Sequence, residues 1–237
     1  MAYGKLKLRR KLMETVAIIT AAGHGKRMGR PKQFIKIGGR PMLWWTLSVF
    51  QKTKSVRGII LVVNAGDIKK LKNFRFSKII KVVSGSEERQ DSVYNGLKAL
   101  PDEADLVIIH DGARPFVTSV VIEAAIRQAR KKGAIVVGVP VKDTIKRVKP
   151  KSLTVNKTVD RDEIWAAQTP QVFKKDLIML AYQKYGMEKV TDDAMLVEKL
   201  GKPVEMLMGS YLNLKVTSPE DLVLAEAILR KNKLRRK

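Results

Sequence analysis

The apolar residues of this chain gather in short runs that alternate with segments of helical periodicity. Runs rich in valine and isoleucine predict strands from Val16 onward and at 58–63, 79–83, 106–109 and 134–139. Apolar residues at helical spacing predict helices between these strands, at 41–50, 67–72, 93–100 and 120–132. Because the strand runs are almost continuously apolar, we expect them to be buried on both faces of a mostly parallel, twisted sheet that helices flank.

The alternation changes after residue 141. Segments 143–148 and 153–159 flank the turn sequence KPKS and predict a β-hairpin where another helix would be expected. Strand alternation places Leu153, Val155 and Val159 on one face of this hairpin. A lone two-stranded arm with an apolar face is marginally stable in water. We therefore expect the arm, at about 142–163, to pack against a second subunit in a homodimer; an arm folded back on its own domain is the alternative.

The remaining segments complete one domain. They predict helices at 174–185 and 194–200, strands at 204–208 and 212–217, and a final helix that begins at Ser218-Pro219. No linker or repeat interrupts the series, so a single α/β domain is expected at 14–230. It lies between a basic N-terminal extension (1–13) and a basic C-terminal tail (231–237).

The charge balance is unusual, with 47 Lys and Arg residues against 23 Asp and Glu residues and a formal net charge of +24. Nucleic acid, an anionic surface or anionic substrates would each fit such a chain. Eleven of the positive charges lie in residues 1–13 and 230–237, and no basic stripe alternates with aromatic residues. A basic nucleic-acid-binding protein, with the tails as its arms, therefore remains the alternative from another functional class. Its binding would weaken steeply with salt.

Two features that the sequence lacks bear on the cellular compartment of the protein. No run of about 18 apolar residues is present, which predicts that no segment spans a membrane. The chain has no cysteine, which excludes a disulfide framework and thiolate chemistry. Both observations favour a cytoplasmic protein.

Glycine-bearing polar loops follow three of the predicted strands, at 22–33, 84–92 and 110–115. In an open α/β sheet, ligands bind at these carboxyl ends of the strands. In the first loop, glycines expose backbone N–H groups, and four cations follow them: Lys26, Arg27, Arg30 and Lys32. This combination predicts a nucleotide triphosphate loop; a solvated glycine turn is the alternative.

The two common glycine loops do not fit this segment. A P-loop requires Ser or Thr after Gly-Lys, and Arg27 follows Lys26 here. A dinucleotide-binding fingerprint requires a small residue where Met28 stands. Cations are therefore expected to neutralise most of the phosphate charge.

Several short motifs occur in register along the chain: 21–28 (AAGHGKRM), 31–34 (PKQF), 88–93 (ERQDSV), 110–115 (HDGARP), 142–144 (KDT), 165–171 (WAAQTPQ), 191–194 (TDDA) and 213–217 (NLKVT). Together they resemble the 2-C-methyl-D-erythritol 4-phosphate cytidylyltransferases of the non-mevalonate isoprenoid pathway, over about residues 15–230. The pentitol phosphate cytidylyltransferases, which act on ribitol 5-phosphate, share the lysine loop and the QTPQ motif. They are the nearest alternative, although the AAG, WAA and TDDA stretches look more like the methylerythritol group.

The resemblance implies a Rossmann-like nucleotidyltransferase domain with a hairpin dimerisation arm. It implies a reaction of CTP with 2-C-methyl-D-erythritol 4-phosphate that gives 4-diphosphocytidyl-2-C-methyl-D-erythritol and pyrophosphate. It implies catalytic roles for Arg27, Lys32, Arg161 and Lys215. It implies nucleotide-binding roles for Ala21, Ala22, Gly23, Gly25, Gly85, Ser86, Glu87, Ser92, Asp111 and Arg114. It implies contacts to the sugar phosphate from Thr144, Arg161, Thr169, Thr191 and Lys215, with Arg161 reaching in from the partner's arm.

This chemistry suits a chain with only two histidines. A phosphate monoester has a second pKa of about 6, so its oxygen is already a nucleophile at neutral pH and needs no general base. His110, at the end of a predicted buried strand, is therefore expected to be structural. The reaction needs charge neutralisation and in-line alignment. We expect Mg²⁺ held largely by CTP oxygens, with Asp111 as the protein contact. An ordinary turn with an Asp111–Arg114 ion pair is the alternative for that carboxylate.

Overall fold

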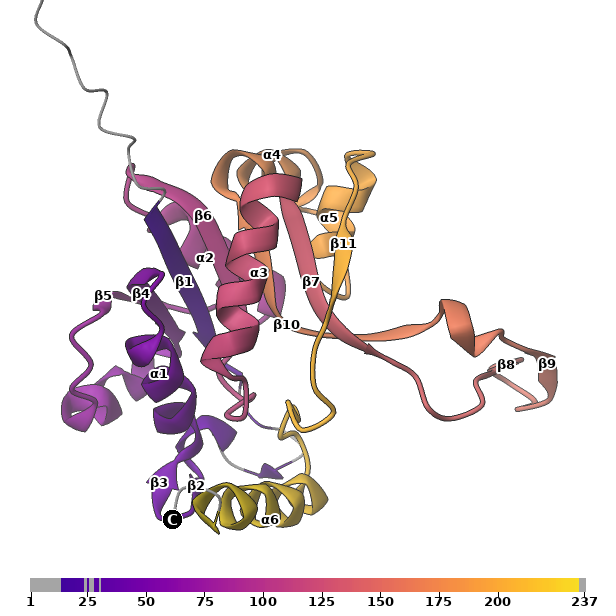
Figure 1. Cartoon of the computed structure of the whole chain (residues 1–237), viewed down its shortest axis with the longest axis horizontal. Coiled ribbons are helices and arrows are strands. Elements are labelled where there is room, and N and C mark those ends of the chain that lie inside the picture. Colours follow the sequence, from indigo (N-terminus) through magenta and orange to yellow (C-terminus); the bar gives the residue numbers. More distant parts are fainter. Residues whose placement is uncertain (1–13, 24, 26–27, 30, 235–237) are drawn as a thin grey trace, which may run out of the picture.

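A computed structural model describes residues 14–23, 25, 28–29 and 31–234 of the chain. They form an α/β domain around a seven-stranded sheet with the strand order β11-β7-β10-β6-β1-β4-β5 (Figure 1). The strands of this sheet are β1 (Glu14–Ala21), β4 (Val56–Val63), β5 (Ile79–Ser84), β6 (Ala104–Asp111), β7 (Ala134–Pro140), β10 (Trp165–Lys174) and β11 (Glu205–Met208). The predicted mostly parallel sheet is confirmed.

One central strand was not predicted. β10 runs antiparallel to both of its neighbours, β6 and β7, whereas β1, β4, β5 and β6 pair in parallel and β11 pairs in parallel with β7. β10 contains the cis peptide bond Thr169–Pro170, and its pairing with β7 shifts register between Ala167 and Gln171.

Helices cover both faces of the sheet. α1 and α3 contribute apolar residues to the core on one face, whereas α2, α4 and α5 do so on the other face. α6 packs with the small hairpin β2–β3 below the sheet (Figure 1). The bounds of these elements are β2 (Lys36–Ile37), β3 (Arg40–Pro41), α1 (Met42–Lys52), α2 (Arg89–Lys98), α3 (Ser119–Lys132), α4 (Lys175–Tyr185), α5 (Ala194–Lys199) and α6 (Pro219–Leu234).

Burial follows the predicted pattern in the inner strands. Ile18, Ile60 and Val62 lie in the core beneath α2, whereas Ile19 and Leu61 lie in the core beneath α1 and α3. β1, β4, β6 and β7 are thus buried on both faces, as expected. The same expectation is wrong for β5, an edge strand whose residues are partly or fully exposed.

The short helix predicted at 67–72 is present as a 3-10 helix, η3 (Ala65–Asn73). One other sequence prediction needs correction. Segment 212–217, predicted as a strand, forms no strand. The Val216 N–H donates to the carbonyl of Ala113, in the loop after β6, and Asn213 accepts from Arg114. This segment therefore crosses the ends of the strands and does not lie along a sheet edge.

The predicted hairpin is confirmed as an arm that projects from the sheet (Figure 1). It consists of β8 (Lys146–Val148) and β9 (Val155–Thr158), paired antiparallel. Leu153 is 75% exposed and Val155 is 53% exposed, so the apolar face of the arm has no cover within its own chain. Within the described part of the chain, the helices are too short or too polar to cross a membrane.

Candidate functional site

A pocket of about 220 Å³ opens at the carboxyl ends of β1 and β6. This is the position where an open α/β sheet binds its ligands. The pocket brings together segments that are far apart in the sequence. Its lining residues are Thr20, Ala21, Ala22, Gly23, Lys32, Gln33, Ser86, Glu87, Arg89, Ser92, Asp111, Ala113 and Lys215.

Asp111 is the charged centre of this pocket. Its Oδ2 atom lies 3.0 Å from Nζ of Lys215 and 3.4 Å from Nε of Arg114, and its Oδ1 atom lies 3.3 Å from Nε of Arg89. Burial alone would raise the pKa of Asp111. The positive charges of Arg89, Lys215 and Arg114 outweigh this effect and hold its pKa far below the usual range. A permanent carboxylate with an excess of cations around it is suited to bind a polyanion.

Arg89 is the functional candidate that sequence reasoning missed. Its Nη2 atom donates to Asp193 at 2.8 Å, and the hydroxyl of Tyr182 donates to the other oxygen of Asp193 at 2.6 Å. Burial would lower the pKa of Arg89, but the charges of Asp193 and Asp111 raise it above its ordinary value. Asp193 thereby fixes Arg89 against Asp111. The signal was present, because Arg89 and Asp193 both lie in motifs that the sequence analysis singled out.

The wall of the pocket formed by the loops after β1 and β5 has little free space. The backbone N–H of Ser86 donates to Oγ of Ser92 at 2.9 Å, and this Oγ atom also donates to the Ser86 carbonyl. A Cβ atom added to Gly85 would lie 2.2 Å from the Cβ of Ala22 and 3.0 Å from Oγ of Ser92. Glycine is therefore required where the loop after β5 approaches the loop after β1.

Lys32 begins the short 3-10 helix η2 (Lys32–Phe34) at the pocket rim. Its neighbour Gln33 is buried and donates from Nε2 to Asp67 at 3.3 Å. Asp67 in η3 also accepts from Lys70 at 2.6 Å. The hydrogen bond between Gln33 and Asp67 ties the segment that carries Lys32 to η3.

His110 directly precedes Asp111 in β6 and is fully buried. Its Nδ1 atom is 3.0 Å from Oγ1 of Thr169, and its Nε2 atom is 3.3 Å from the carbonyl oxygen of Arg114. Thr169 also accepts from the Asp111 N–H at 3.0 Å. Burial lowers the pKa of His110 to about 3, so the ring is neutral near pH 7. The expected structural role of His110 is confirmed.

The buried His110 ring predicts a loss of stability in mild acid. Between pH 6.5 and 3 the unfolded chain binds a proton at this residue that the folded chain does not, so acid favours unfolding. The free energy of unfolding should fall by up to about 1.4 kcal/mol for each pH unit below 6.5. Urea unfolding between pH 7 and 5 measures this slope. In His110→Gln the slope should be shallower; an unchanged slope would assign the acid sensitivity to other groups.

The matches to known proteins cover almost the whole chain. A family model described as 2-C-methyl-D-erythritol 4-phosphate cytidylyltransferase (IspD) matches residues 15–231. This chain belongs to that family. Proteins with this name from Halalkalibacterium halodurans and Alkaliphilus oremlandii are 48% and 46% identical to it, over 92% of this chain and 97% and 96% of theirs.

Solved structures of IspD proteins have the same fold. The structure of 4-diphosphocytidyl-2C-methyl-D-erythritol synthase from Anaerococcus prevotii has a TM-score of 0.83 and 38% identity, and covers 92% of this chain and 97% of its own. The 2-C-methyl-D-erythritol 4-phosphate cytidylyltransferase from Thermus thermophilus has a TM-score of 0.77 and 33% identity, covering 92% of this chain and 100% of its own. The resemblance inferred from the motifs is confirmed.

The IspD fold brings most of the predicted nucleotide residues together. The pocket lining includes nine residues expected at the site: Ala21, Ala22, Gly23, Lys32, Ser86, Glu87, Ser92, Asp111 and Lys215. Gly85 and Arg114 contact members of this set, and Thr169 lies behind Asp111. Gly25 and Thr191 are not among the lining residues. Arg27 lies outside the described residues.

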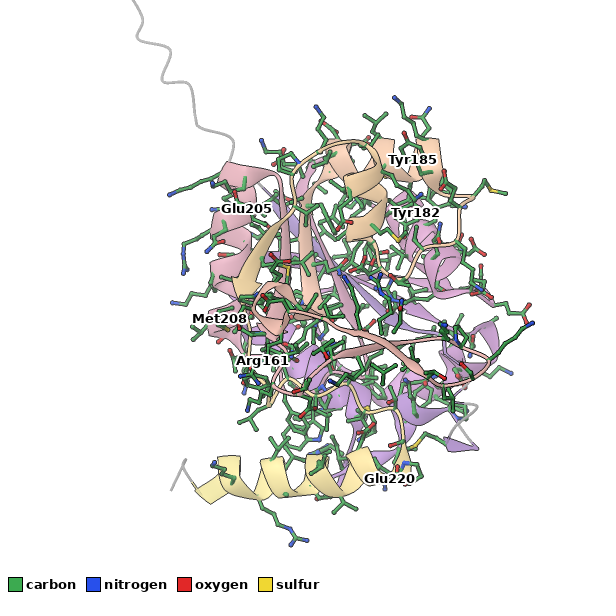
Figure 2. The ribbon with its side chains drawn as sticks, turned by 90° about the vertical axis from the view of Figure 1, so that its right-hand side faces the viewer. Arg161, Tyr182, Tyr185, Glu205, Met208 and Glu220 are labelled. Atoms are coloured by element: carbon green, nitrogen blue, oxygen red, sulfur yellow. The ribbon has the colours of Figure 1, made fainter. Side chains whose placement is uncertain are left out.

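The two predicted arm residues are separated from the pocket of their own chain. Thr144 precedes β8, and Arg161 lies in the short helix η4 (Arg161–Glu163) between β9 and β10. Figure 2 views the molecule from the side on which the arm projects and shows Arg161 on this side. The Nη1 atom of Arg161 donates to the carbonyl of Lys142 at 3.1 Å. Neither Thr144 nor Arg161 lines the pocket.

A Mg²⁺ ion fits the donor set of this IspD pocket only if the substrate supplies most of its ligands. Within the described residues no cluster of three acidic or histidine side chains could hold a metal. Asp111 offers one ionised carboxylate whose oxygens also accept from cations. Magnesium is commonly held by one or two carboxylates, phosphate oxygens and waters, so a single carboxylate is compatible with a nucleotide-bound ion.

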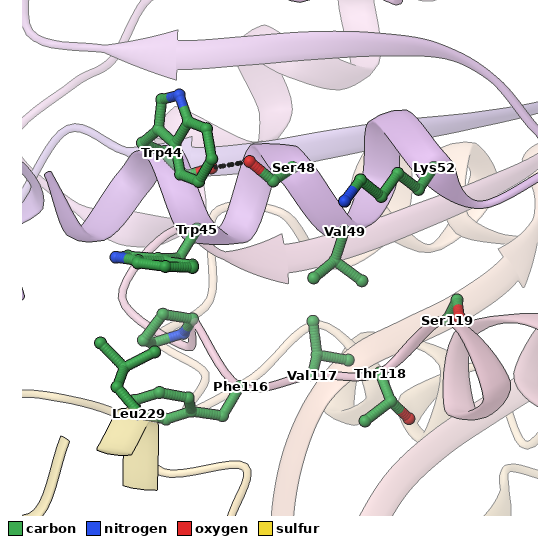
Figure 3. Close-up of a pocket in the computed structure, with 11 residues that line it drawn as sticks. Trp44, Trp45, Ser48, Val49, Lys52, Phe116, Val117, Thr118, Ser119 and Leu229 are labelled. Carbon is green, nitrogen blue, oxygen red and sulfur yellow. Dashed lines mark hydrogen bonds between the residues drawn. The ribbon is translucent and has the colours of Figure 1, made fainter. Parts of the chain in front are cut away.

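A larger cavity, of about 390 Å³, lies away from these residues, between α1, the loop after β6 and α6 (Figure 3). Trp44, Trp45 and Phe116 form much of its wall, and among the described residues that line it only Lys52 is charged. Because it lacks the cluster of cations that phosphates require, we assign the reaction to the smaller pocket.

Proposed function

We propose that this chain transfers the cytidylyl group of CTP to 2-C-methyl-D-erythritol 4-phosphate and releases pyrophosphate. The observation that carries the proposal is the convergence of Lys32, Arg89 and Lys215 on the pocket around Asp111. Two anions must meet in this reaction, and fixed cations lower the repulsion between them. Membership of the IspD family supports the choice of both substrates. The cytoplasmic location expected from the sequence stays a prediction.

The attacking group is an oxygen of the sugar phosphate. It is ionised near neutral pH, since the second pKa of a phosphate monoester is about 6, and it attacks the α-phosphorus of CTP. The bond from that phosphorus to the bridging oxygen breaks, and pyrophosphate leaves. No side chain has to remove a proton, which agrees with the neutral, buried ring of His110. In this proposal Arg27 and Lys32 hold the triphosphate, and Lys215 orients the attacking phosphate.

The loops after β1 and β5 are proposed to hold the cytidine. Small residues at 21–23 and at Gly85 and Ser86 let these two loops approach one another at the pocket, and Ser92 holds the second loop in place. Asp111 and Arg114 would lie near the ribose and the phosphates. Mg²⁺ bound to the triphosphate and Asp111 would add positive charge at the reacting phosphates.

Adding a methyl group at Gly85 should weaken CTP binding. In Gly85→Ala the new Cβ meets the Cβ of Ala22, so one of the two loops must move. Forced shifts of this kind cost about 1–3 kcal/mol; if this cost falls on CTP binding, KM for CTP should rise by about five-fold to 150-fold. Initial rates at varied CTP measure the effect. Gly66→Ala is the matched control, because nothing lies within 4 Å of its added Cβ.

Thr144, Arg161, Thr169 and Thr191 are proposed to bind the sugar phosphate. Thr144 and Arg161 lie on the arm, outside the pocket of their own chain. The exposed Leu153 and Val155 support the proposal that this arm packs on a second copy, in a homodimer. Arg161 would then complete the pocket of the partner.

Mixing two inactive variants tests this exchange of arms. In a mixed dimer of Lys32→Ala and Arg161→Ala, one pocket carries both changes and the other carries neither. Random reassociation should therefore restore about a quarter of the wild-type sites. A mixture no more active than its components would show that Arg161 acts within its own chain or not at all.

The reaction itself is tested by pyrophosphate release with CTP and Mg²⁺. Release with 2-C-methyl-D-erythritol 4-phosphate and none with ribitol 5-phosphate is the expected result. Release with ribitol 5-phosphate alone would keep the nucleotide half of the site and overturn the sugar assignment. A folded sample inactive with both substrates would contradict the proposed function.

A further inference from the structure

The loop that follows β11, at 209–215, contacts both the base of the arm and the nucleotide pocket. It begins where the Gly209 N–H donates to the carbonyl of Gly138 in β7, and it ends at Lys215 beside Asp111. Function has so far been assigned only to Lys215. The residues before it connect the pocket of this chain to the arm that is proposed to enter the partner's pocket.

Tyr211 makes the contact at the arm. Its hydroxyl donates to the carbonyl of Pro140 at 2.8 Å, at the last residue of β7 before the arm. The ammonium group of Lys142, two residues into the arm, lies 3.7 Å from the centre of the Tyr211 ring. This distance is well within the range of a cation–π interaction. The carbonyl of the same Lys142 accepts from Arg161 at 3.1 Å. Tyr211 thus contacts Lys142, the residue whose carbonyl accepts the hydrogen bond from Arg161.

The residues on either side of Tyr211 are hydrogen-bonded to β10 and to Arg114. The Ser210 carbonyl accepts from Nε2 of Gln168 at 3.0 Å. Nδ2 of Asn213 donates to Oε1 of Gln168 and to the Thr169 carbonyl at 3.0 and 2.9 Å. Arg114 donates to the Asn213 carbonyl at 2.9 Å. Tyr211 is therefore mounted on a fixed segment, and the arm leaves the sheet beside it.

We propose that Tyr211 and Lys142 form a clamp that sets the direction in which the arm leaves its own domain toward the partner's pocket, and that both are positioning residues for the sugar phosphate. The clamp acts through Thr144 and Arg161, so it rests on the proposed role of the arm. Beyond the pairing of Pro140 with Trp165, the stem of the arm is held by the hydrogen bond from the Val141 N–H to the Ile164 carbonyl. β8 and β9 are exposed throughout, so within one chain the arm direction depends on this base.

Kinetics of graded variants test the clamp. Tyr211→Phe keeps the ring and loses the bond to Pro140, whereas Tyr211→Ala loses both contacts. Lys142→Gln removes the cation, and Lys142→Arg keeps it. The hydrogen bond to Pro140 and the cation–π contact each contribute about 1 kcal/mol, which corresponds to about five-fold in rate. The kcat/KM for the sugar phosphate should therefore fall about five-fold in Tyr211→Phe and in Lys142→Gln. It should fall about ten-fold or more in Tyr211→Ala and remain near wild type in Lys142→Arg. KM for CTP should not change.

A double-mutant cycle separates the clamp from direct substrate binding by Lys142. In the Tyr211→Ala background, Lys142→Gln should have no further effect, because its partner is already absent. An equal loss in both backgrounds would show that Lys142 acts on the substrate itself and would overturn the proposal. An equal rise in KM for both substrates, or no effect of Tyr211→Ala, would overturn it as well.

Hydrogen exchange gives a readout that does not depend on activity. Amides at the stem, near Val141 and Ile164, should exchange faster in Tyr211→Ala than in wild type, and those of β1 and β6 should not. Unchanged exchange at the stem would overturn the clamp even if activity fell. A wild-type protein inactive with both sugar phosphates would refute the proposed function and leave the exchange test of the clamp intact.

Discussion

Replacing Lys32 with alanine should lower kcat by about two to three orders of magnitude while the fold is retained. In the proposed reaction its ammonium group faces the charge that develops as pyrophosphate leaves, and removing one such group from a preorganised site typically costs 10²- to 10³-fold. Lys32 lines the pocket from η2, outside the main sheet, so the core does not depend on it. Pyrophosphate release at saturating CTP and sugar phosphate measures the loss.

Lys36→Ala is the matched control for this variant. Lys36 is an exposed lysine on the same segment, in β2, and does not line the pocket. Its turnover should stay within about two-fold of wild type, as is usual for surface substitutions. Unfolding curves of both variants should overlay that of wild type. Turnover near normal in Lys32→Ala would remove Lys32 from the catalytic set.

The second large effect is expected for Lys215→Met. Nζ of Lys215 lies 3.0 Å from Asp111, where the proposed sugar phosphate must approach the nucleotide. Methionine keeps much of the length of the side chain and removes its charge. We expect kcat/KM for the sugar phosphate to fall by about 10²-fold or more, since a charged donor to the attacking phosphate is lost.

Binding of CTP should change much less in Lys215→Met, because Arg89 and Arg114 still neutralise Asp111. Titration with CTP in the absence of the sugar phosphate measures this directly. Lys202→Met, at an exposed position, is the control. If CTP affinity fell as far as turnover, Lys215 would belong to the nucleotide half of the site.

The strand pattern was predictable where burial is two-sided. β1, β4, β6 and β7 are continuous apolar runs because helices cover both faces, and the sequence shows this directly. β5 has a similar β-branched composition but lies at an edge, where neighbouring strands and not local sequence decide exposure. β10 was missed because Gln168, Thr169 and Pro170 interrupt its apolar pattern.

Segment 212–217 shows the reverse error. Its alternating apolar and polar residues have the period of a strand, yet Val216 packs beneath α6 while Lys215 faces the pocket. Two different environments, and not two faces of a sheet, produce the alternation. A local pattern cannot distinguish these cases, since the decision depends on whether a sheet edge is available nearby.

The site was predictable as a set of loops, but the partners within it were not. The loops that contain Gly85, Ser92 and Asp111 follow from the rule that ligands bind at strand ends, whereas the roles of these residues came from the family resemblance. The ion pair of Arg89 with Asp193 joins residues 104 positions apart, and only the packing of α2 against α4 and α5 brings them together. The Asp111–Arg114 ion pair, which the sequence offered as the alternative for that carboxylate, is present because the two residues share one turn.

The arm has a topological consequence for how such proteins diverge. It leaves β7 at Pro140 and returns in β10 at Trp165, and these two residues are directly opposite one another in the sheet. The arm is thus an insertion into what would otherwise be a simple hairpin between adjacent strands. Its length and sequence can drift without changing the register of any core strand. Under the proposed role of the arm in binding the sugar phosphate, selection for a new acceptor can therefore act on the arm while the nucleotide half of the protein is inherited unaltered.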